Sequence, residues 1–346
     1  MYCSLDYYVI DITKDLKKLE QIKSVLQLSN LNLDHHIQYF AVAEDNSGIV
    51  ACAGIDSNVI KCVAIHPDYR GNNINLTLLD TAIKFANDIG HFHLFLYTKP
   101  ENKDFFKGCG FYPIVEIENL IVLMENTPVG ISRFCEKLSL TKKEGSKIGS
   151  IVMNANPFTN GHRYLVECAS KQCDWVHLFV VSEDASLFSF QDRIKLVQQG
   201  TLDLSNVTVH SSTDYMISKA TFPTYFLKNP QEIDRAYMGI DLLIFRNFIA
   251  PALNITHRFV GTEPFSEVTN AYNEAMTYWL KDEHVSSYPA IDLIEIERLM
   301  FADNVISASR VRHLLQNNYF NEIEKIVPLT TWNYLKNNFI NTKVHR

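Results

Sequence analysis

The sequence predicts an α/β protein with a mixed α/β domain first and a doubly wound parallel sheet second. Three observations lead to this fold class. The 346 residues exceed what one ordinary hydrophobic core holds, so two domains are expected. Short apolar strands and amphipathic helices alternate in the first part of the chain. After residue 148 the order becomes a repeated strand–helix alternation, which favours a parallel sheet.

The first domain is expected over residues 1–130. A turn at residues 45–48 lies between two expected strands, which predicts a hairpin. Thr13 is a candidate N-cap of the first helix. Strands are expected at 39–44, 49–53, 60–65 and 93–97, and helices around 16–26 and 76–86.

A boundary between the domains is expected at residues 131–147. This stretch is polar and basic, with lysines at 137, 142, 143 and 147 and few apolar positions. It fits a linker, and it equally fits a solvated surface helix. Under both alternatives the second domain covers 148–346.

The second domain is expected to be a Rossmann-like sheet. Strands are predicted at 148–153, 175–182, 207–210, 258–261 and 291–296, and helices at 161–173, at 191–199 and from near Ser307 and Asn321. In such sheets ligands bind at the carboxyl ends of the strands. Residues that directly follow these strands are therefore the first candidates for a site.

The composition limits the classes of partner that this protein is expected to bind. The net charge of −7 gives no overall attraction to nucleic acid or to an anionic membrane. The beginning of the chain lacks a basic-then-apolar signal, and apolar runs are strand-length. Seven cysteines without a C-x-x-C pair argue against a disulfide framework and a zinc site. We expect a cytoplasmic protein without nucleic-acid or membrane partners.

The most informative segment is 151–162, where a buried strand runs into a proline-containing turn and Gly161-His162 opens a helix. The first amides of a helix have no intrahelical partner, and the helix dipole favours anions there. Gly161 permits close approach of backbone and phosphate. His162 can donate to a phosphoryl oxygen and stabilise charge that develops at the α-phosphorus. A lone histidine would more often be a cap or a core residue, but the whole segment favours a phosphate site.

This segment resembles the nucleotidyltransferase superfamily with the H/T-x-G-H motif. Residues 159–162 match the motif in full, and Asn156-Pro157 matches the pair that precedes it, whereas Met153 and Ala155 stand where glycine and phenylalanine are common. The resemblance implies ATP as cofactor, with Mg²⁺ on its phosphates. It implies catalytic roles for His162 and Thr159 and nucleotide contacts from Asn154, Asn156, Pro157, Phe158 and Gly161.

Two later segments resemble other elements of this superfamily. Residues 306–312 resemble I-S-S-T-x-x-R, which implies that Ser307 and Ser309 hold the triphosphate and that Arg312 neutralises it. Arg310 falls at a variable position, and an ordinary N-capped helix is the alternative. Residues 260–263 resemble a nucleoside-facing loop with Gly261 and Glu263, or form a plain turn. Arg193 matches a helix arginine of relatives, or makes a surface salt bridge.

The first half resembles the GNAT acyltransferase fold. Residues 61–71 resemble its strand and pyrophosphate-loop entry, and 104–111 resemble its late F-Y-x-x-x-G-F signature. Asn73 and Asn75 occupy places where glycines usually let backbone amides reach a pyrophosphate. Asparagine tolerates positive φ, but its side chain crowds that approach. The fold match is therefore good, while these two asparagines argue against an acetyltransferase activity.

A GNAT-like half followed by these nucleotidyltransferase elements resembles the citrate lyase ligase family over nearly the entire chain. This implies that acetate and ATP form acetyl-AMP. The acetyl group then passes to the thiol of the coenzyme-A-like prosthetic group on the citrate lyase acyl carrier subunit. The first half either helps receive that prosthetic arm or serves as a scaffold. The alternatives are a nucleotidyltransferase that acts on a phosphorylated metabolite and a GNAT-type N-acetyltransferase.

Overall fold

A computed structural model describes residues 4–71, 73–181, 187–211, 213–216, 222–227, 229–262 and 267–340. The chain forms two compact units. The first combines Met1–Arg133 with Phe222–Ile240, and the second combines Phe134–Thr221 with Asp241–Arg346. The fold class expected from the sequence is confirmed, since a mixed sheet is followed by a parallel one. Residues 222–240, expected in the second domain, belong instead to the first unit.

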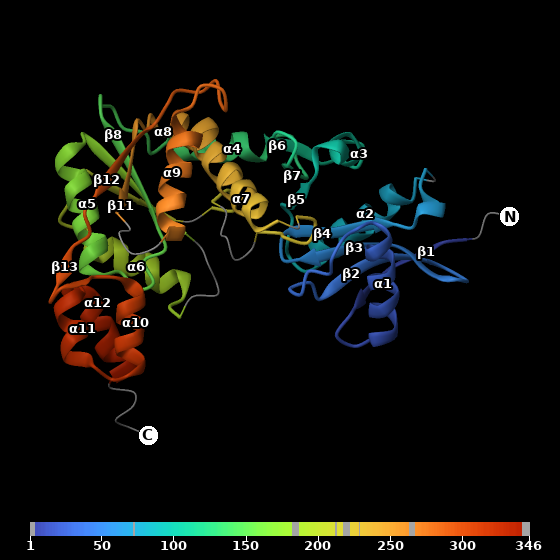
Figure 1. The fold of residues 1–346 in the computed structure, drawn as a ribbon, viewed down its shortest axis with the longest axis horizontal. Coiled ribbons are helices and arrows are strands. Elements are labelled where there is room, and N and C mark those ends of the chain that lie inside the picture. The colour runs from blue at the N-terminus through green and yellow to red at the C-terminus, as the bar shows by residue number, and fades with distance from the viewer. Residues whose placement is uncertain are drawn as a thin grey trace. The chain divides into compact units, whose positions relative to one another are not determined.

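The first unit is built on a seven-stranded sheet in the order β1-β2-β3-β4-β5-β7-β6 (Figure 1). Neighbouring strands are antiparallel except β4 and β5. Helix α1 begins after Asp15, whose side chain accepts a hydrogen bond from the amide of Lys18, so Asp15 and not Thr13 is the cap. The elements are β1 Asp6–Asp11, α1 Leu16–Leu28, β2 Tyr39–Asp45, β3 Gly48–Asp56, β4 Val59–Ile65, α2 Ile74–Asp88, β5 Phe95–Thr98, α3 Lys103–Lys107, β6 Tyr112–Ile117 and β7 Ile121–Glu125.

Helix α4 (Gly130–Ser139) occupies the first part of the stretch expected to be a linker or a surface helix. The unit boundary, between Arg133 and Phe134, falls within it. Two further boundaries fall between Thr221 and Phe222 and between Ile240 and Asp241, and the last of these lies within helix α7 (Pro230–Ile244).

The second unit contains five parallel strands in the order β10-β9-β8-β11-β12. The order reverses between β8 and β11, which is where ligands of such sheets bind. Figure 1 shows α5 on one side of this sheet and α9 on the other. The elements are β8 Ile148–Met153, α5 Asn160–Gln172, β9 Trp175–Val180, α6 Phe190–Gly200, β10 Val207–His210, α8 Ala250–Leu253, β11 His257–Gly261, α9 Glu267–Lys281, β12 Asp292–Ile296, β13 Met300–Phe301, β14 Asn304–Val305, α10 Ala308–Gln316, α11 Phe320–Ile326 and α12 Leu329–Leu335.

A π-helical turn, Phe245–Ile249, joins α7 to α8 and positions a buried arginine. Arg246 is 1% exposed and donates to five backbone carbonyls around the end of α9, from Trp279, Asp282, Ser286, Tyr288 and Pro289. These bonds satisfy the guanidinium and fix the neighbouring Phe245 against the sheet, where Phe179 meets its ring edge-on.

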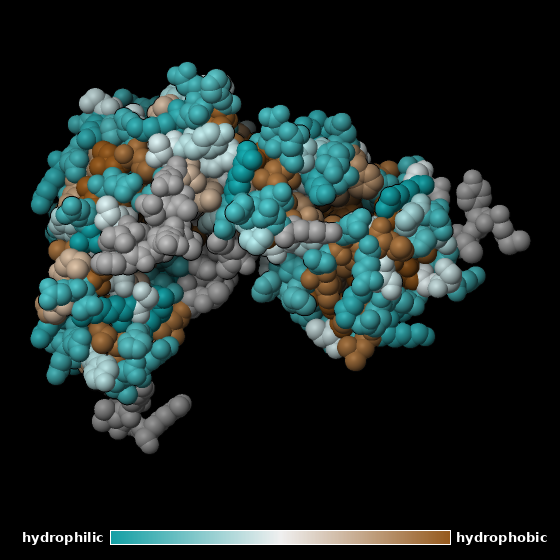
Figure 2. Space-filling model, in the orientation of Figure 1, coloured by the Kyte–Doolittle hydropathy of each residue, from teal (hydrophilic) through white to brown (hydrophobic). Residues whose placement is uncertain are grey.

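One helix in the described part of the chain, Pro230–Leu253, is long and apolar enough to cross a membrane by length and composition. Within the protein 61% of its most apolar 18-residue window is buried, as expected for a core helix of a globular protein. Figure 2 shows mainly hydrophilic residues on the visible face of the molecule, with small separate apolar groups. These features give a membrane partner only weak support.

Candidate functional site

The turn after β8 is fixed by two arginines. Arg193, fully buried on α6, donates from Nη1 to the backbone and side-chain oxygens of Asn154, both at 2.7 Å. Arg312 on α10 donates to the backbone oxygen of Asn156 at 2.6 Å. The Asn156 side chain accepts from the amide of Phe188 at 3.3 Å, and the Asn156–Pro157 peptide bond is cis. Asn154 and Asn156 thus use side-chain oxygens to hold the turn. Arg193 is a positioning residue and not a surface salt bridge.

Helix α5 begins with a reciprocal capping box. The Thr159 hydroxyl accepts from the amide of His162 at 3.3 Å, and Nδ1 of His162 accepts from the amide of Thr159 at 3.1 Å. Thr159 is only 1% exposed. Its hydroxyl thus helps to position His162, and the catalytic role expected for Thr159 stays a prediction.

Burial and the capping box together determine the charge and the tautomer of His162. Burial, and then the charge of Arg298, lower the pKa of His162 to about 4, so the imidazole is neutral at pH 7. Because Nδ1 accepts the Thr159 amide, the single ring proton resides on Nε2. His162 therefore presents a neutral N–H donor beside the amides that open α5. That arrangement suits an anionic oxygen.

Phe158 supports this ring from within the core. Its side chain is fully buried, packs against Gly200 and stacks nearly parallel to the His162 ring, with 5.9 Å between centroids and 10° between planes. The nucleotide contact expected for Phe158 stays a prediction. Its place beneath His162 makes it a support for the donor.

Gly161 brings the two sequence motifs together. A Cβ added at Gly161 would lie 2.7 Å from the backbone oxygen of Ile306, which directly precedes α10. The start of α5 and the start of α10 therefore lie side by side. Because α5 follows the carboxyl end of β8, both helices begin at that edge of the sheet, where helix starts favour anions.

The two arginines of helix α10 contact different parts of the chain. The Ser307 hydroxyl caps the helix by accepting from the Arg310 amide at 3.2 Å, and it lies 3.0 Å from the Ser309 hydroxyl. Arg310 turns away, donating to the oxygen of Phe301 and pairing with Glu322 at 3.7 Å. Arg312 reaches the turn at Asn156. The structure thus places Arg312 at the site and Arg310 outside it.

The opposite side of the site includes an arginine that the sequence analysis missed. Gly261 ends β11, and Nε of Arg298 lies 3.4 Å from the position of a Cβ there. The charge of Arg298 also acts on His162, so it belongs to the same region. Its signal in the sequence is its place two residues after β12, at the carboxyl edge. Glu263, the other residue expected in the nucleoside loop, lies outside the described residues.

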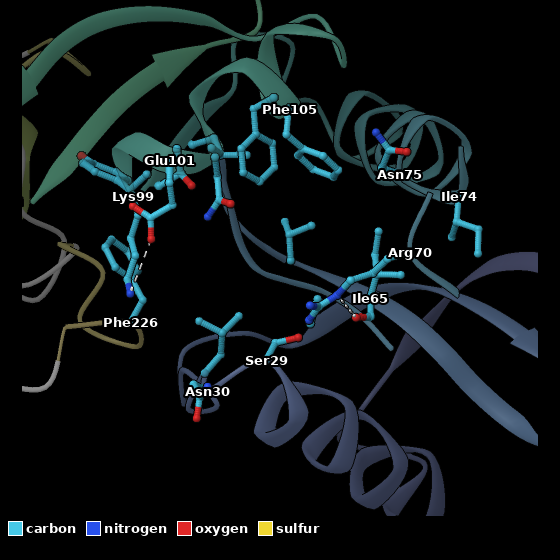
Figure 3. Close-up of a pocket in the computed structure, with 18 of the residues that line it drawn as sticks. Ser29, Asn30, Ile65, Arg70, Ile74, Asn75, Lys99, Glu101, Phe105 and Phe226 are labelled. Carbon is cyan, nitrogen blue, oxygen red and sulfur yellow. Dashed lines mark hydrogen bonds and ion pairs between the residues drawn. The ribbon is translucent and has the colours of Figure 1, made fainter. Parts of the chain in front are cut away.

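The first unit contains a pocket of about 530 Å³ (Figure 3). Strands β4 and β5 pair only at Val59 with Phe95 and at Ile60 with Leu96, so they separate farther along. The pocket opens between the separated strands, with Arg70 and Asn75 on the side of α2. Asn73, just before α2, has φ +54°, the left-handed conformation that glycine would otherwise supply.

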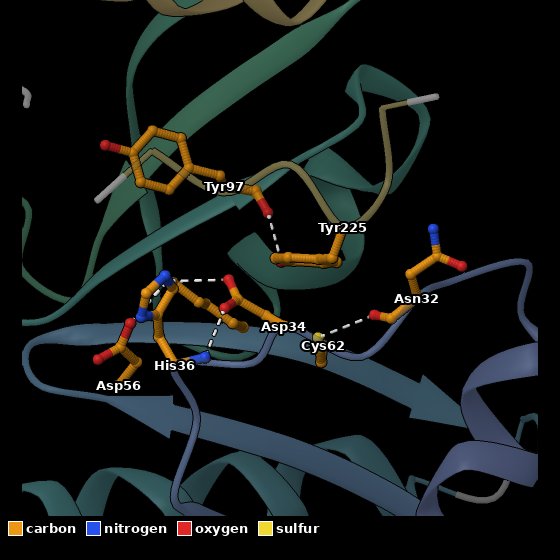
Figure 4. A network of polar contacts seen from close by, with 8 residues as sticks. Asn32, Asp34, His36, Asp56, Cys62, Tyr97 and Tyr225 are labelled. Carbon is orange, nitrogen blue, oxygen red and sulfur yellow. Dashed lines mark hydrogen bonds and ion pairs between the residues drawn. The ribbon is translucent and has the colours of Figure 1, made fainter. Parts of the chain in front are cut away.

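Residues 222–227 form a wall of this pocket. The backbone amide of Asn32 donates to the backbone oxygen of Tyr225 at 3.1 Å. The Tyr225 hydroxyl donates to the backbone oxygen of Tyr97 at 3.5 Å (Figure 4). Nearby, the buried Lys61 pairs with Asp34 at 3.0 Å and Asp56 at 2.6 Å, which anchors the loop that carries Asn32. Tyr225 and Phe226 both line the pocket.

Comparison with known proteins identifies the family. The model of the citrate lyase ligase C-terminal domain matches residues 148–335, and a GNAT acetyltransferase domain matches 36–113. The [citrate [pro-3S]-lyase] ligase of Escherichia coli is 47% identical over 93% of this chain and 91% of its own length. The chain belongs to the citrate lyase ligase family. The ligase of Haemophilus influenzae is 48% identical over 94% of this chain and 97% of its own length.

As a family member the chain is a ligase enzyme, and the resemblance found in the sequence is confirmed. Among solved structures, Thermotoga maritima TmcAL bound with alpha-thio ATP shares 14% identity over 56% of each chain, with a TM-score of 0.34. We draw no argument about ligand or site from a likeness at that level.

Proposed function

We propose that this ligase activates acetate with ATP as acetyl-AMP and transfers the acetyl group to the prosthetic-group thiol of the citrate lyase acyl carrier subunit. The observation that carries the proposal is the neutral Nε2–H of His162, presented where the starts of α5 and α10 meet. Family membership supports the substrate class, since the relatives are named as ligases for citrate lyase.

In the first step, a carboxylate oxygen of acetate attacks the α-phosphorus of ATP and pyrophosphate leaves. Negative charge grows on the phosphoryl oxygens as the bond to pyrophosphate breaks. The His162 donor, the helix amides and Arg312 would stabilise that charge, a role of positioning and electrostatics. In the second step, the thiolate of the prosthetic arm attacks the acetyl carbon and AMP leaves. No side-chain nucleophile is needed.

The donor set of the site fits phosphate and not a bare cation. It consists of N–H groups and guanidinium groups, and the described residues contain no cluster of three histidine, cysteine or acidic side chains. Mg²⁺ is commonly bound through phosphate oxygens and water. We therefore place Mg²⁺ on the phosphates of ATP, where it would neutralise charge, with Ser307 and Ser309 beside the same phosphates.

The proposal is tested by ATP–pyrophosphate exchange with and without acetate. Exchange that depends on acetate is expected. Exchange that requires a phosphorylated metabolite would favour the nucleotidyltransferase alternative, and acetylation of amines from acetyl-CoA without ATP would favour the N-acetyltransferase alternative.

The two arginines of α10 provide a matched pair. Arg312→Lys is expected to raise the KM for ATP about 10-fold, because an ammonium cannot replace the planar fork that spans the turn and a phosphate. Arg310→Lys is expected to change it less than 2-fold, since Arg310 already pairs with Glu322 away from the site. Exchange kinetics with varied ATP measure both. The reverse ranking would show that the motif is wrongly aligned.

We further propose that the pocket of the first unit receives the coenzyme-A-like arm. Its apolar floor includes Val63 and Leu96, and Arg70 is an exposed cation at its rim, suited to a phosphorylated arm with apolar stretches. A fragment that starts near Lys147 would lack the partners of residues 222–240, so the full chain must be used.

Arg70→Glu in the full chain is expected to raise the KM for the carrier subunit about 10-fold through charge repulsion at the rim. Acetate-dependent pyrophosphate exchange should stay within 2-fold of wild type. Lys17→Glu, an exposed charge reversal outside the pocket, is the control. Equal carrier kinetics in both variants would leave the first unit as a scaffold.

A further inference from the structure

The pocket of the first unit opens where the ladder between β4 and β5 stops. The Phe95 amide donates to the Asn58 oxygen at 2.8 Å, and the two strands then pair at two positions. With this phase, the next hydrogen bond of a parallel ladder would run from the Cys62 amide to the Tyr97 oxygen. The pairing of the described strands ends just before that bond. Both residues are buried, so these two backbone groups require other partners.

The hydroxyl of Tyr225 stands in the place of that ladder bond. It donates to the backbone oxygen of Tyr97 at 3.5 Å and accepts from the backbone amide of Cys62 (Figure 4). Burial raises the pKa of Tyr225 well above its usual range, so the hydroxyl stays neutral and can both accept and donate. A phenolic oxygen between two strands holds them farther apart than a direct hydrogen bond does. Tyr225 is therefore a wedge at the point where the strands separate.

Contacts on both sides hold the wedge in the first unit. The backbone oxygen of Tyr225 accepts from the Asn32 amide at 3.1 Å, and the Cys62 thiol donates to the Asn32 oxygen at 3.4 Å. The ring of Phe222 meets the Tyr97 ring edge-on, with 5.4 Å between centroids. Cys62 itself has φ +52°, and the register of β3 and β4 shifts beside it. A residue other than glycine keeps this conformation only where its surroundings impose it.

The wedge adjoins the pocket and comes from a distant part of the sequence. Residues 63–65 of β4 and 97–98 of β5, which follow the last paired positions, line the pocket together with 225–226. Tyr225 lies within the match to the ligase C-terminal domain and outside the match to the GNAT domain. The ligase half of the sequence thus supplies the group that separates the two strands. Without this group, the ladder could extend into the space that the pocket occupies.

We propose that Tyr225 keeps the pocket open for the coenzyme-A-like arm, so that binding of the arm depends on a segment from the ligase half of the sequence. Tyr225 is a positioning residue, since it acts through the two strands and not through the reacting atoms. Binding of the arm should in turn hold residues 222–227 in place, because a ligand stabilises the state to which it binds. This inference rests on the proposed function, which assigns the pocket to the arm.

The test measures acetyl transfer in the full chain with varied carrier subunit. Tyr225→Phe keeps the ring but drives the Cys62 amide to bond the Tyr97 oxygen directly, so the KM for the carrier should rise about 10-fold, with the KM for ATP within about 2-fold. Tyr112→Phe removes an exposed hydroxyl outside the pocket, and Tyr237→Leu weakens packing on Phe222 without touching the bridge. Both controls should keep the wild-type KM. An equal rise in Tyr237→Leu would show that Tyr225 acts only by packing and would overturn the inference.

A measurement on the wild type covers the case in which Tyr225→Phe does not fold. Coenzyme A, used as the probe of the pocket, should slow amide hydrogen exchange in residues 222–227. Binding of coenzyme A without such slowing would overturn the wedge. A carrier KM raised by Arg70→Glu and unchanged by Tyr225→Phe would also overturn it and leave the pocket assignment standing. If coenzyme A does not bind and neither variant changes the carrier KM, the pocket assignment itself fails, and the inference with it.

Discussion

Replacing His162 by alanine is expected to lower kcat by about 10²-fold or more, as observed when one donor to a transition-state oxyanion is removed. The imidazole is neutral, its Nδ1 is used by the Thr159 amide, and its Nε2–H is the group left for a phosphoryl oxygen. Steady-state exchange kinetics with saturating ATP and acetate measure the change. Circular dichroism should show an intact fold.

Two further substitutions at His162 distinguish its role as a hydrogen-bond donor from its role in the capping box. Asparagine places an acceptor near the position of Nδ1, so it should preserve the capping box and the unfolding temperature but lose activity. Glutamine places an amide donor near the position of Nε2, so it should lose part of the cap and retain more activity. If the asparagine variant is the more active, His162 acts only as a cap and our assignment is wrong.

The chemistry-bearing start of α5 could be predicted because it depends on local sequence. A β-strand, a turn with proline and the residues 159–162 follow one another without a gap, and the structure forms β8 and α5 there. The parallel sheet was predictable for the same reason, since strand–helix alternation is a local pattern. The strand at 207–210 and the hairpin around 45–48 also lie where expected.

Which side chains near the site are buried could not be predicted from the sequence. Thr159 and Phe158 are neighbours of the donor in sequence, and the structure adds that both side chains are buried and contact His162. Arg298 was missed because it matches no motif and approaches the site only through the folded sheet. Residues 222–240 follow β10 in sequence but pack in the first unit, through contacts such as Asn32 to Tyr225 that are distant in sequence.

Gly161→Ala is expected to lower kcat/KM for ATP by about 10-fold to 100-fold while the protein stays folded. The added Cβ would lie 2.7 Å from the Ile306 backbone oxygen, and a backbone carbonyl cannot rotate away as a flexible side chain can. The starts of α5 and α10 must therefore move apart. Because both helices are proposed to hold the triphosphate, a displacement of this kind misplaces several donors together, and small misplacements are costly in catalysis.

The stability of Gly161→Ala should fall less than its activity. Alanine is a better helix former than glycine by about 1 kcal/mol, which offsets part of the strain of the displaced helices. Thermal unfolding and exchange kinetics on the same preparation give both quantities. Gly108→Ala in the first unit, where the nearest atom to an added Cβ is 3.3 Å away, is the matched control and should keep wild-type exchange. Wild-type kcat/KM for ATP in Gly161→Ala would mean that the contact between the two helix starts does not form the nucleotide site.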